Sequence, residues 1–149
     1  MNTENLTSFY GEDSKYGTFD ELKEQLLYRK VVEWTEDKIV LNDGTVVTIE
    51  MSEWDCCASA GGRFTNVELD AAITDITIGD KKRHDLYDGD TYESSAVIKL
   101  YHNQNEIAQA EATADAGNGG FYYSVASLLV KDVFYRVVES GETDEEEVE

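Results

Sequence analysis

The spacing of apolar residues is helical near the start of the chain. Apolar side chains recur at three- and four-residue intervals from Phe19 to Leu27, which is the spacing of one face of a helix. Thr18 and Glu21 stand before this run with the Thr-x-x-Glu spacing of a capping box, in which each side chain accepts a hydrogen bond from the other residue's backbone N–H. We therefore expect one short helix over residues 19–28.

From Lys30 onward the apolar positions follow a period of two. The runs VVEW (31–34), KIVL (38–41) and TVVTIE (45–50) are rich in β-branched residues and are typical of strands. The pair Asp43-Gly44 separates the second run from the third, and an Asp-Gly pair between such runs is a strong hairpin signal. These features predict an antiparallel meander.

The rest of the chain continues with strand-like runs separated by polar segments. Residues 79–93 read as a polar loop and 115–120 as a glycine-rich hairpin turn, while the run 131–138 fits either a strand or a short terminal helix. Strands are expected at 67–78, 95–101, 106–114 and 121–130. The predicted fold is mainly β (α+β): an antiparallel meander sheet of about seven strands, rolled or sandwiched, with one short N-terminal helix.

The length of 149 residues suits a single domain. Composition divides the chain into a flexible polar arm (1–17), one β-rich domain (18–138) and a disordered acidic tail (139–149). The chain has no apolar run of about 18 residues and no signal-peptide pattern at its start, so we expect neither a membrane span nor secretion. A cytoplasmic protein with reduced thiols is the expectation.

Charge is the strongest global feature of the sequence. Thirty-two acidic residues oppose 12 basic ones, for a net charge of −20. Such a field repels nucleic acids and anionic membranes, and it attracts basic proteins such as those that themselves bind nucleic acid. Solubility alone is the simpler explanation of the same charge.

The stretch WDCCASAGG (54–62) raises the question of metal or thiol chemistry. Adjacent cysteines lack the C-x₂₋₄-C spacing of zinc sites, and Glu50, Glu53 and Asp55 oppose the formation of a reactive thiolate. A disulfide between neighbouring cysteines is a rare and strained alternative. We expect Cys56 and Cys57 to be structural, one packed in the core and one under a loop, with Gly61 and Gly62 supplying a tight backbone, and we expect no metal and no cofactor.

Two further stretches resemble ligand loops only in part. The glycine-rich run DAGNGG (115–120) could cradle a phosphate through backbone amides, but it lacks the Lys-Ser/Thr ending of a P-loop, so a turn is the better interpretation. In HDLYDGD the aspartates resemble a calcium loop. Counting from Asp85, however, the sixth residue is Asp90 rather than glycine and the twelfth is Ala96 rather than glutamate.

The order of several motifs is similar to that of a family of small uncharacterised domains found mostly in bacteriophages and prophages. The matching pieces are LNDGTVVTIE (41–50), WDCCASAG (54–61), ITDITI (73–78), AVIKLYHNQNEIAQAEATADAGNGGFYYS (96–124) and SLLVK (127–131). Members of that family often carry a further cysteine after the CC pair, which this chain lacks. The resemblance implies a phage protein in the host cytoplasm and no established activity.

The candidate partner-binding residues lie in and beside the predicted polar loop. Two tyrosines could anchor a contact while the carboxylates steer a basic partner, and loops between strands often carry binding residues. The set is Asp85, Tyr87, Asp88, Asp90, Tyr92 and Glu93.

These observations predict a phage-encoded, non-enzymatic protein that binds and inhibits a basic, nucleic-acid-binding host protein. An anti-defence role, such as anti-CRISPR or anti-restriction activity by nucleic-acid mimicry, follows from the acidic charge and the phage resemblance. The alternative is a small-ligand binder that sequesters a nucleotide defence signal. It would use Tyr122 or Phe121 beside the glycine turn and Arg63 or Arg83 on the phosphates.

Overall fold

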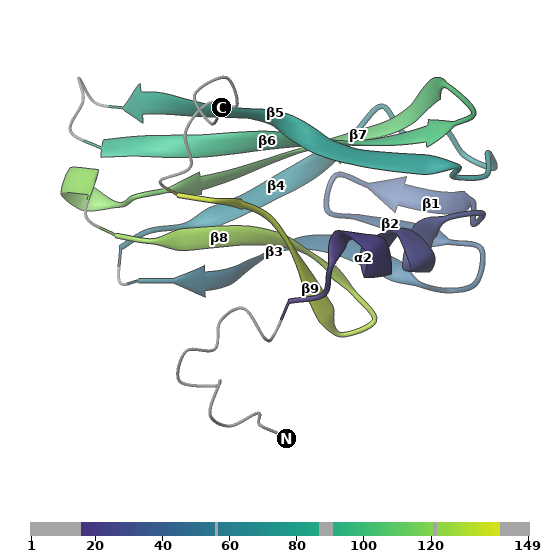
Figure 1. Cartoon of the computed structure of the whole chain (residues 1–149), viewed down its shortest axis with the longest axis horizontal. Coiled ribbons are helices and arrows are strands. Elements are labelled where there is room, and N and C mark those ends of the chain that lie inside the picture. Colours follow the sequence, from purple (N-terminus) through teal and green to yellow (C-terminus); the bar gives the residue numbers. More distant parts are fainter. Residues whose placement is uncertain (1–15, 56, 87–90, 121, 141–149) are drawn as a thin grey trace.

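The computed structural model describes residues 16–55, 57–86, 91–120 and 122–140, and within them the chain is mainly strand. The expectation of a mainly β protein with one short helix is confirmed (Figure 1). The elements are α2 (Phe19–Leu26), β1 (Val31–Thr35), β2 (Lys38–Leu41), β3 (Val46–Trp54), β4 (Ala60–Thr65), β5 (Asp75–Leu86), β6 (Thr91–His102), β7 (Asn105–Asp115), the short 3₁₀ segment η3 (Asn118–Gly120), β8 (Ser124–Val130) and β9 (Val133–Glu139).

The strands form two antiparallel sheets that pack face to face as a sandwich (Figure 1). One sheet has five strands in the order β1-β2-β3-β8-β9, and the other has four in the order β4-β7-β6-β5. The predicted meander of the first three strands is confirmed, with the β2–β3 connection at Asp43-Gly44. In the chain, all four strands of the second sheet lie between β3 and β8, so β8 and β9 return to the first sheet after β7.

The core lies between the two sheets, and β7 supplies it with small side chains. Ala108, Ala110, Ala112 and Ala114 alternate along β7 and are at most 1% exposed, so every second residue of this strand faces inward as alanine. Small residues on one sheet leave room for larger ones such as Ile98 and Leu128 from the neighbouring elements.

The helix α2 closes the edge of the sandwich between β9 and β5 (Figure 1). The predicted capping box is present: the Glu21 backbone N–H donates to Thr18 Oγ1 at 3.1 Å and the Thr18 N–H donates to Glu21 Oε1 at 2.8 Å. Leu22 and Leu26 are buried in the core. The helix ends two residues earlier than predicted because Leu27 is extended, and it is too short and too polar to cross a membrane.

The predicted polar loop at 79–93 is wrong for the residues that the structure describes. After a β-bulge between Gly79 and Lys82, β5 continues to Leu86, and β6 begins at Thr91. All four side chains from Lys82 to Asp85 are exposed, so backbone pairing with β6 rather than core burial maintains this part of β5. The alternation of apolar residues cannot reveal such a strand because neither of its faces is apolar.

Several predicted boundaries also differ from the structure. Segment 115–120 is a crossover between the two sheets rather than a hairpin turn, since β7 and β8 do not pair. Gly61 and Gly62 belong to the strand β4, and residues 67–72 form no strand. Of the two alternatives for residues 131–138, the strand is observed, as β9. With β4 and β9 included, the described sandwich has nine strands rather than about seven.

Both ends of the folded region extend beyond the predicted limits. The Gly17 backbone N–H donates to the Phe134 carbonyl at 2.8 Å, and Tyr16 forms a parallel bridge with Phe134. At the other end β9 includes Glu139, and Ser140 N–H donates to the Ser124 carbonyl at 2.9 Å. The remainder of the predicted arm and tail, residues 1–15 and 141–149, lies outside the described residues.

Candidate functional site

Three segments that are distant in sequence meet at one end of the sandwich, on the left in Figure 1. Backbone hydrogen bonds join them: Ala116 N–H donates to the Tyr92 carbonyl at 3.0 Å, Tyr122 N–H to the Ala116 carbonyl at 2.7 Å, and Asp55 N–H to the Tyr123 carbonyl at 2.8 Å. We call this surface the aromatic end and define it by Trp54, Asp55, Asp85, Tyr92, Tyr122 and Tyr123.

Trp54 is the most exposed aromatic side chain of this end. It is the last residue of β3, pairs with Ser124 of β8, and leaves 57% of its surface exposed. The ladder between β3 and β8 fixes its backbone, so the exposed indole is presented from a rigid element. Exposed aromatic side chains on rigid elements are typical anchors of protein interfaces.

The structure separates the predicted partner-binding residues into two faces. Asp85 and Tyr92 are opposite each other in the β5–β6 register and share a face, whereas Glu93 is opposite His84 on the other face. The Arg83 guanidinium lies 3.9 Å from the centre of the Tyr92 ring, within cation–π range. The other three predicted residues, Tyr87, Asp88 and Asp90, lie outside the described residues.

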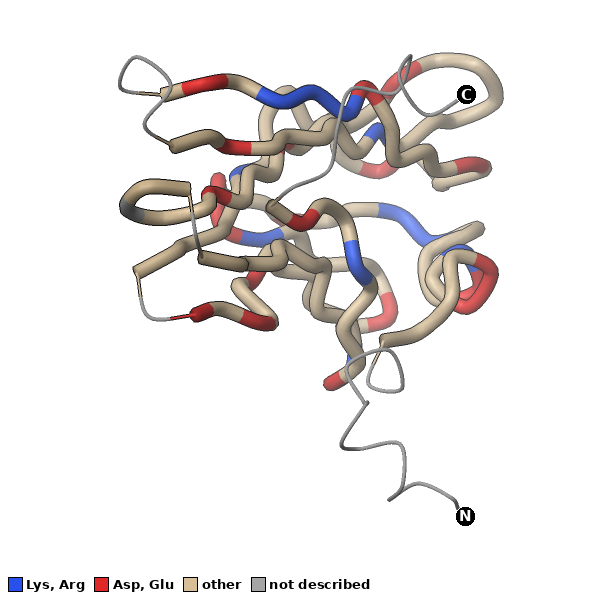
Figure 2. The backbone as a smooth tube through the Cα atoms, turned by 60° about the vertical axis from the view of Figure 1, so that its left-hand side comes forward, with Lys and Arg blue, Asp and Glu red and all other residues tan. Residues whose placement is uncertain are grey.

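The described part of this hairpin carries both signs of charge (Figure 2). Lys81, Lys82 and Arg83 lie on β5 between Asp80 and Asp85, and Figure 2 shows this basic stretch between two acidic positions. The acidic character of the aromatic end therefore depends on carboxylates from other segments as well.

Two tyrosine hydroxyls hold carboxylates close to the aromatic end. Tyr123 Oη donates to Glu139 Oε1 at 2.6 Å, and Tyr16 Oη donates to Glu53 Oε2 at 2.5 Å. Arg136 connects the two pairs, because its Nη1 donates to Glu139 Oε2 at 3.2 Å and its guanidinium lies 4.4 Å from the centre of the Tyr16 ring.

The same contacts keep both hydroxyls protonated. Burial, followed by the hydrogen bond to Glu53, raises the pKa of Tyr16 to about 12. Burial and the hydrogen bond to Glu139 also raise the pKa of Tyr123 above its usual value. The sequence does not indicate this network because its members come from β3, β9, the residue before β8 and the start of the described chain, which are far apart in sequence.

The glycine-rich crossover is stabilised by a carboxylate rather than arranged around an anion. Asp115 Oδ1 accepts hydrogen bonds from the backbone N–H of Ser59 at 2.9 Å and of Gly117 at 3.1 Å, and Oδ2 accepts from Ser59 Oγ at 3.0 Å. Ser124 Oγ donates to the Asp115 and Ser59 carbonyls at 2.8 and 3.0 Å. Because the negatively charged Asp115 carboxylate already occupies the Gly117 N–H, a phosphate group would be repelled from that N–H.

The residues expected for the alternative function, nucleotide binding, do not all lie in one site. Arg83 lies on Tyr92, next to the strand end that bonds to Ala116. Arg63 extends from β4 toward Glu111 of β7, with its Nη2 3.8 Å from Glu111 Oε1. Phe121 lies outside the described residues.

The interpretation of the cysteines requires a correction. Cys57 is exposed and disulfide-bonded, so the expectation of reduced thiols with a packed side chain is wrong for this residue. The turn directs the Cys57 backbone inward instead: a Cβ on Gly117 would lie 2.9 Å from the Cys57 carbonyl oxygen, and Ala58 takes the buried position at 6% exposure. Cys56 lies outside the described residues, and within the described ranges no three His, Cys, Asp or Glu side chains form a group that could hold a metal ion.

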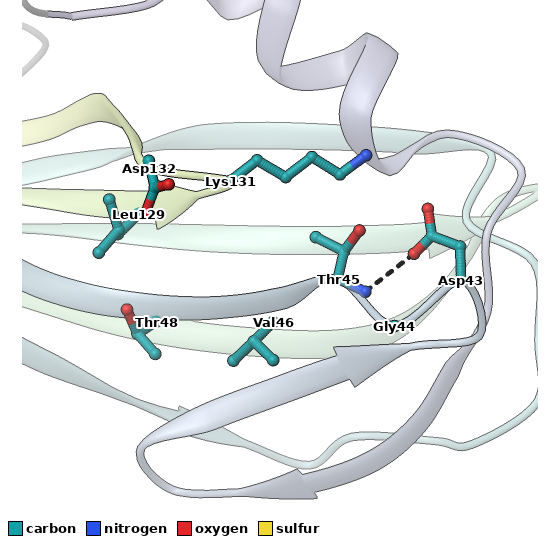
Figure 3. A pocket seen from close by; sticks show the side chains of 8 residues that line it. All are labelled: Asp43, Gly44, Thr45, Val46, Thr48, Leu129, Lys131 and Asp132. Carbon is teal, nitrogen blue, oxygen red and sulfur yellow. Dashed lines mark hydrogen bonds between the residues drawn. The ribbon is translucent and has the colours of Figure 1, made fainter.

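A concave surface lies at the opposite end of the five-stranded sheet from the aromatic end (Figure 3). It has a volume of about 460 Å³, lies between the β2–β3 and β8–β9 turns, and is lined by Asp43, Gly44, Thr45, Val46, Thr48, Leu129, Lys131 and Asp132. Arg29 Nε donates to Asp43 Oδ2 at 2.7 Å and holds the pKa of this carboxyl below its usual range. We call this surface the turn hollow; no sequence motif indicates it.

Comparison with protein families gives one match, which runs from α2 to β8 and includes the WDCC stretch and the glycine-rich crossover. Neither the curated proteins nor the solved structures contain a match to the chain. The expected resemblance to an uncharacterised family is confirmed at this level. The chain belongs to the family described as a domain of unknown function (DUF7448), whose model matches residues 24–129.

Proposed function

We propose that the protein is a phage-encoded, non-enzymatic inhibitor that binds a basic, nucleic-acid-binding host protein in the host cytoplasm. The observation that carries this proposal is the aromatic end: Trp54, 57% exposed, stands beside the exposed carboxylate of Asp55 on a rigid strand end. The exposed Asp85 and the half-buried Tyr92 belong to the same end.

The chemistry of this end suits a basic partner. An indole and tyrosine rings supply the desolvated anchors of an interface, and lysine or arginine side chains of the partner can pair with the carboxylates around them. Asp55 and Asp85 have no ion pair among the described residues, so both are available to a partner.

The overall charge supports the same conclusion. A net charge of −20 steers basic proteins toward the molecule and repels nucleic acid. Carboxylates at alternate positions of a strand are about 6.6–6.8 Å apart, a spacing of the same order as that of phosphates along a nucleic-acid strand. A nuclease of an anti-phage defence, such as a CRISPR or restriction enzyme, is therefore the target class, and occupation of its nucleic-acid cleft is the mode of inhibition.

We assign binding rather than catalysis to this end because the tyrosine and carboxyl groups that lie beside Asp55 and Asp85 are engaged with each other. The Tyr123 hydroxyl is held by Glu139 and the Tyr16 hydroxyl by Glu53. Asp115 accepts two hydrogen bonds from Ser59 and one from Gly117 of the crossover.

Sequestration of a nucleotide is the second candidate, and one observation favours it. Arg83 and Tyr92 place a cation and an aromatic ring beside the strand end that bonds to Ala116. The carboxylate of Asp115 on the Gly117 amide and the charge of −20 both oppose an anionic ligand there.

The experiment compares two variants with the same change in charge. Asp55→Lys/Asp85→Lys alters the aromatic end, and Glu68→Lys/Glu106→Lys alters the opposite end, where Glu68 N–H bonds to Ile107 at the start of β7. Immobilised wild type and both variants are exposed to host lysate at about 0.05 and 0.5 M salt, between which screening of charge rises steeply. Bound proteins are identified by mass spectrometry and then assayed for nucleic-acid binding with and without inhibitor.

We expect wild type to capture a basic nucleic-acid-binding protein at low salt. Glu68→Lys/Glu106→Lys should still capture this protein, and Asp55→Lys/Asp85→Lys should not. The captured protein should lose nucleic-acid binding when the inhibitor is present. Equal retention by both variants, or a captured protein whose nucleic-acid binding is unaffected, would overturn the proposal. A co-purified nucleotide would favour the second candidate.

A further inference from the structure

An apolar stripe crosses the outer face of the five-stranded sheet. In each strand the residues that alternate with buried core positions point outward, and each strand has one apolar residue among them. Val40 is directly opposite Val46 and Leu129 is directly opposite Phe134, whereas Val46 lies two residues from Thr48, the partner of Leu129, and Val32 lies in the bulge next to Glu33, the partner of Val40. We call this set the outer stripe; it consists of Val32 (β1), Val40 (β2), Val46 (β3), Leu129 (β8) and Phe134 (β9).

The outer stripe is accessible at its centre and at one end. Val46 is 43% exposed and Val32 is 42% exposed, whereas the neighbouring inward residues Val47 and Val31 are at most 1% exposed. Val46 and Leu129 also line the turn hollow, so the stripe continues into a concave surface of about 460 Å³. Apolar side chains that line a concave, accessible face are typical of a docking surface.

Lys131 extends along the turn hollow (Figure 3) and has no ion pair among the described residues. The carboxylate of Asp43 in the same hollow is already paired with Arg29. The hollow thus offers two apolar side chains, Val46 and Leu129, and the ammonium group of Lys131, next to the carboxylate of Asp132, to an occupant that carries apolar and acidic side chains.

The described chain begins beside this surface. Tyr16 bridges Phe134, the β9 member of the stripe, and its ring lies under the Arg136 guanidinium while its hydroxyl reaches Ser52 at 2.9 Å and Glu53. The bridge is parallel, so the chain runs in the same direction at Tyr16 and at Phe134, and the turn at Lys131 and Asp132 lies on the N-terminal side of the bridge.

The preceding segment has the length and the composition of such an occupant. Fifteen residues come before Tyr16. Fully extended, they span about 50 Å, whereas five strands cover only about 19 Å across a sheet. The segment contains Leu6, Phe9 and Tyr10 as apolar side chains and Glu12 and Asp13 as carboxylates.

We propose that residues 1–15 dock on the outer stripe and the turn hollow of their own chain. Phe9 and Leu6 contact the stripe, and the carboxylates of Glu12 and Asp13 pair with Lys131. A second copy of the chain is the less favourable occupant because each copy carries a net charge of −20. The inference does not depend on the proposed function, since the aromatic end is at the other end of the sheet.

Hydrogen–deuterium exchange of the full chain tests the proposal directly. In wild type, amides within residues 5–13 should exchange at least about tenfold more slowly than in an unstructured peptide. Val46→Asn should return them to peptide rates. The matched control Val97→Asn changes the same residue type on the outer face of the other sheet, and it should leave the protection unchanged.

A second variant separates docking from folding. Phe9→Ser alters only the segment, so it should abolish protection of residues 5–13 while leaving the thermal midpoint of the domain close to that of wild type. Peptide-like exchange in wild type, or protection that survives Val46→Asn, overturns the proposal. A dimer in light scattering that Val46→Asn converts to monomer, without protection of residues 5–13, also overturns it and assigns the stripe to an interface between copies.

Discussion

Two neighbouring glycines of β4 have opposite surroundings. A Cβ added to Gly62 would point between the sheets, 3.0 Å from the Ala112 Cα and the Ile49 Cγ2 and closer still to the Glu111 carbonyl oxygen. A Cβ added to Gly61 would meet no atom within 4 Å. The close packing of β4 against β7 of its own sheet and against Ile49 of the facing sheet therefore requires glycine at position 62 but not at position 61.

This difference predicts a sharp contrast between two alanine variants. Gly62→Ala should lower the free energy of unfolding by about 1–3 kcal/mol, because backbone must shift to accept the new methyl group. Gly61→Ala should change it little or raise it by about 0.5 kcal/mol, since alanine loses less conformational entropy than glycine in a strand. Urea unfolding of both variants and wild type measures the difference, and equal effects would show that Gly62 is not tightly packed against β7 and Ile49.

The tyrosine–carboxylate pairs predict a loss of stability at alkaline pH. The pKa of Tyr16 is raised from 10.0 to about 12 in the folded state, so the proton is held more tightly folded than unfolded. The stabilisation by this group is fully present below pH 10 and is lost as the pH rises toward 12. Tyr123 changes in the same direction.

Removal of the hydroxyls gives the matching measurement. Tyr16→Phe/Tyr123→Phe should be less stable than wild type by about 1–3 kcal/mol at pH 8, and the difference should shrink between pH 10 and 12. Urea unfolding midpoints of wild type and the variant, measured from pH 8 to 12, give this difference in stability. Tyr28→Phe, at a tyrosine that is 75% exposed, is the control and should behave as wild type.

At the scale of elements, the last two described residues complete β9. Glu139 accepts hydrogen bonds from Tyr123 and Arg136, and Ser140 pairs with Ser124 through both its backbone N–H and its Oγ. A chain that ends after Gly141 keeps all of these bonds, whereas one that ends after Val138 loses them.

We therefore expect the two truncations to differ. The chain ending after Gly141 should unfold near the wild-type temperature. The chain ending after Val138 should lose about 2–4 kcal/mol, roughly one for each hydrogen bond removed. Calorimetry measures the thermal midpoint of unfolding of both chains. Similar midpoints would mean that Glu139 and Ser140 contribute little to the stability of the sheet.

At the scale of the whole molecule, net charge works against the compact state. Like charges repel at −20, and salt screens this repulsion with a Debye length of about 10 Å at 0.1 M. The thermal midpoint should therefore rise as sodium chloride increases from about 0.02 to 0.5 M.

The chain that ends after Gly141 provides the control for this prediction. It lacks six of the acidic residues, Glu142, Asp144, Glu145, Glu146, Glu147 and Glu149, and its formal charge is −14. The rise in midpoint with salt should be smaller for this chain. A midpoint that falls with salt in both chains would show that ion pairs such as Lys23–Asp75 outweigh the general repulsion.

Local patterns determined the parts of the fold that depend on near neighbours in sequence. The capping box of Thr18 and Glu21, the hairpin at Asp43-Gly44 and the alternation of the apolar strands each depend on interactions within a few residues, and each was predictable. The mainly antiparallel β class follows from the same patterns, because alternating strands joined by short connections must pair and bury one face.

Tertiary structure alone decided which strands share a sheet and what gathers at their ends. Backbone pairing extends β5 through exposed residues that no apolar pattern marks, and a crossover replaces the hairpin expected at Asp115–Gly120. The segments that carry Trp54, Tyr92 and Tyr122 lie at the same end because backbone hydrogen bonds join them, although they are dozens of residues apart. Only the packed sandwich specifies such contacts, since the sequence encodes the tendency of each strand to pair but not the identity of its distant partner.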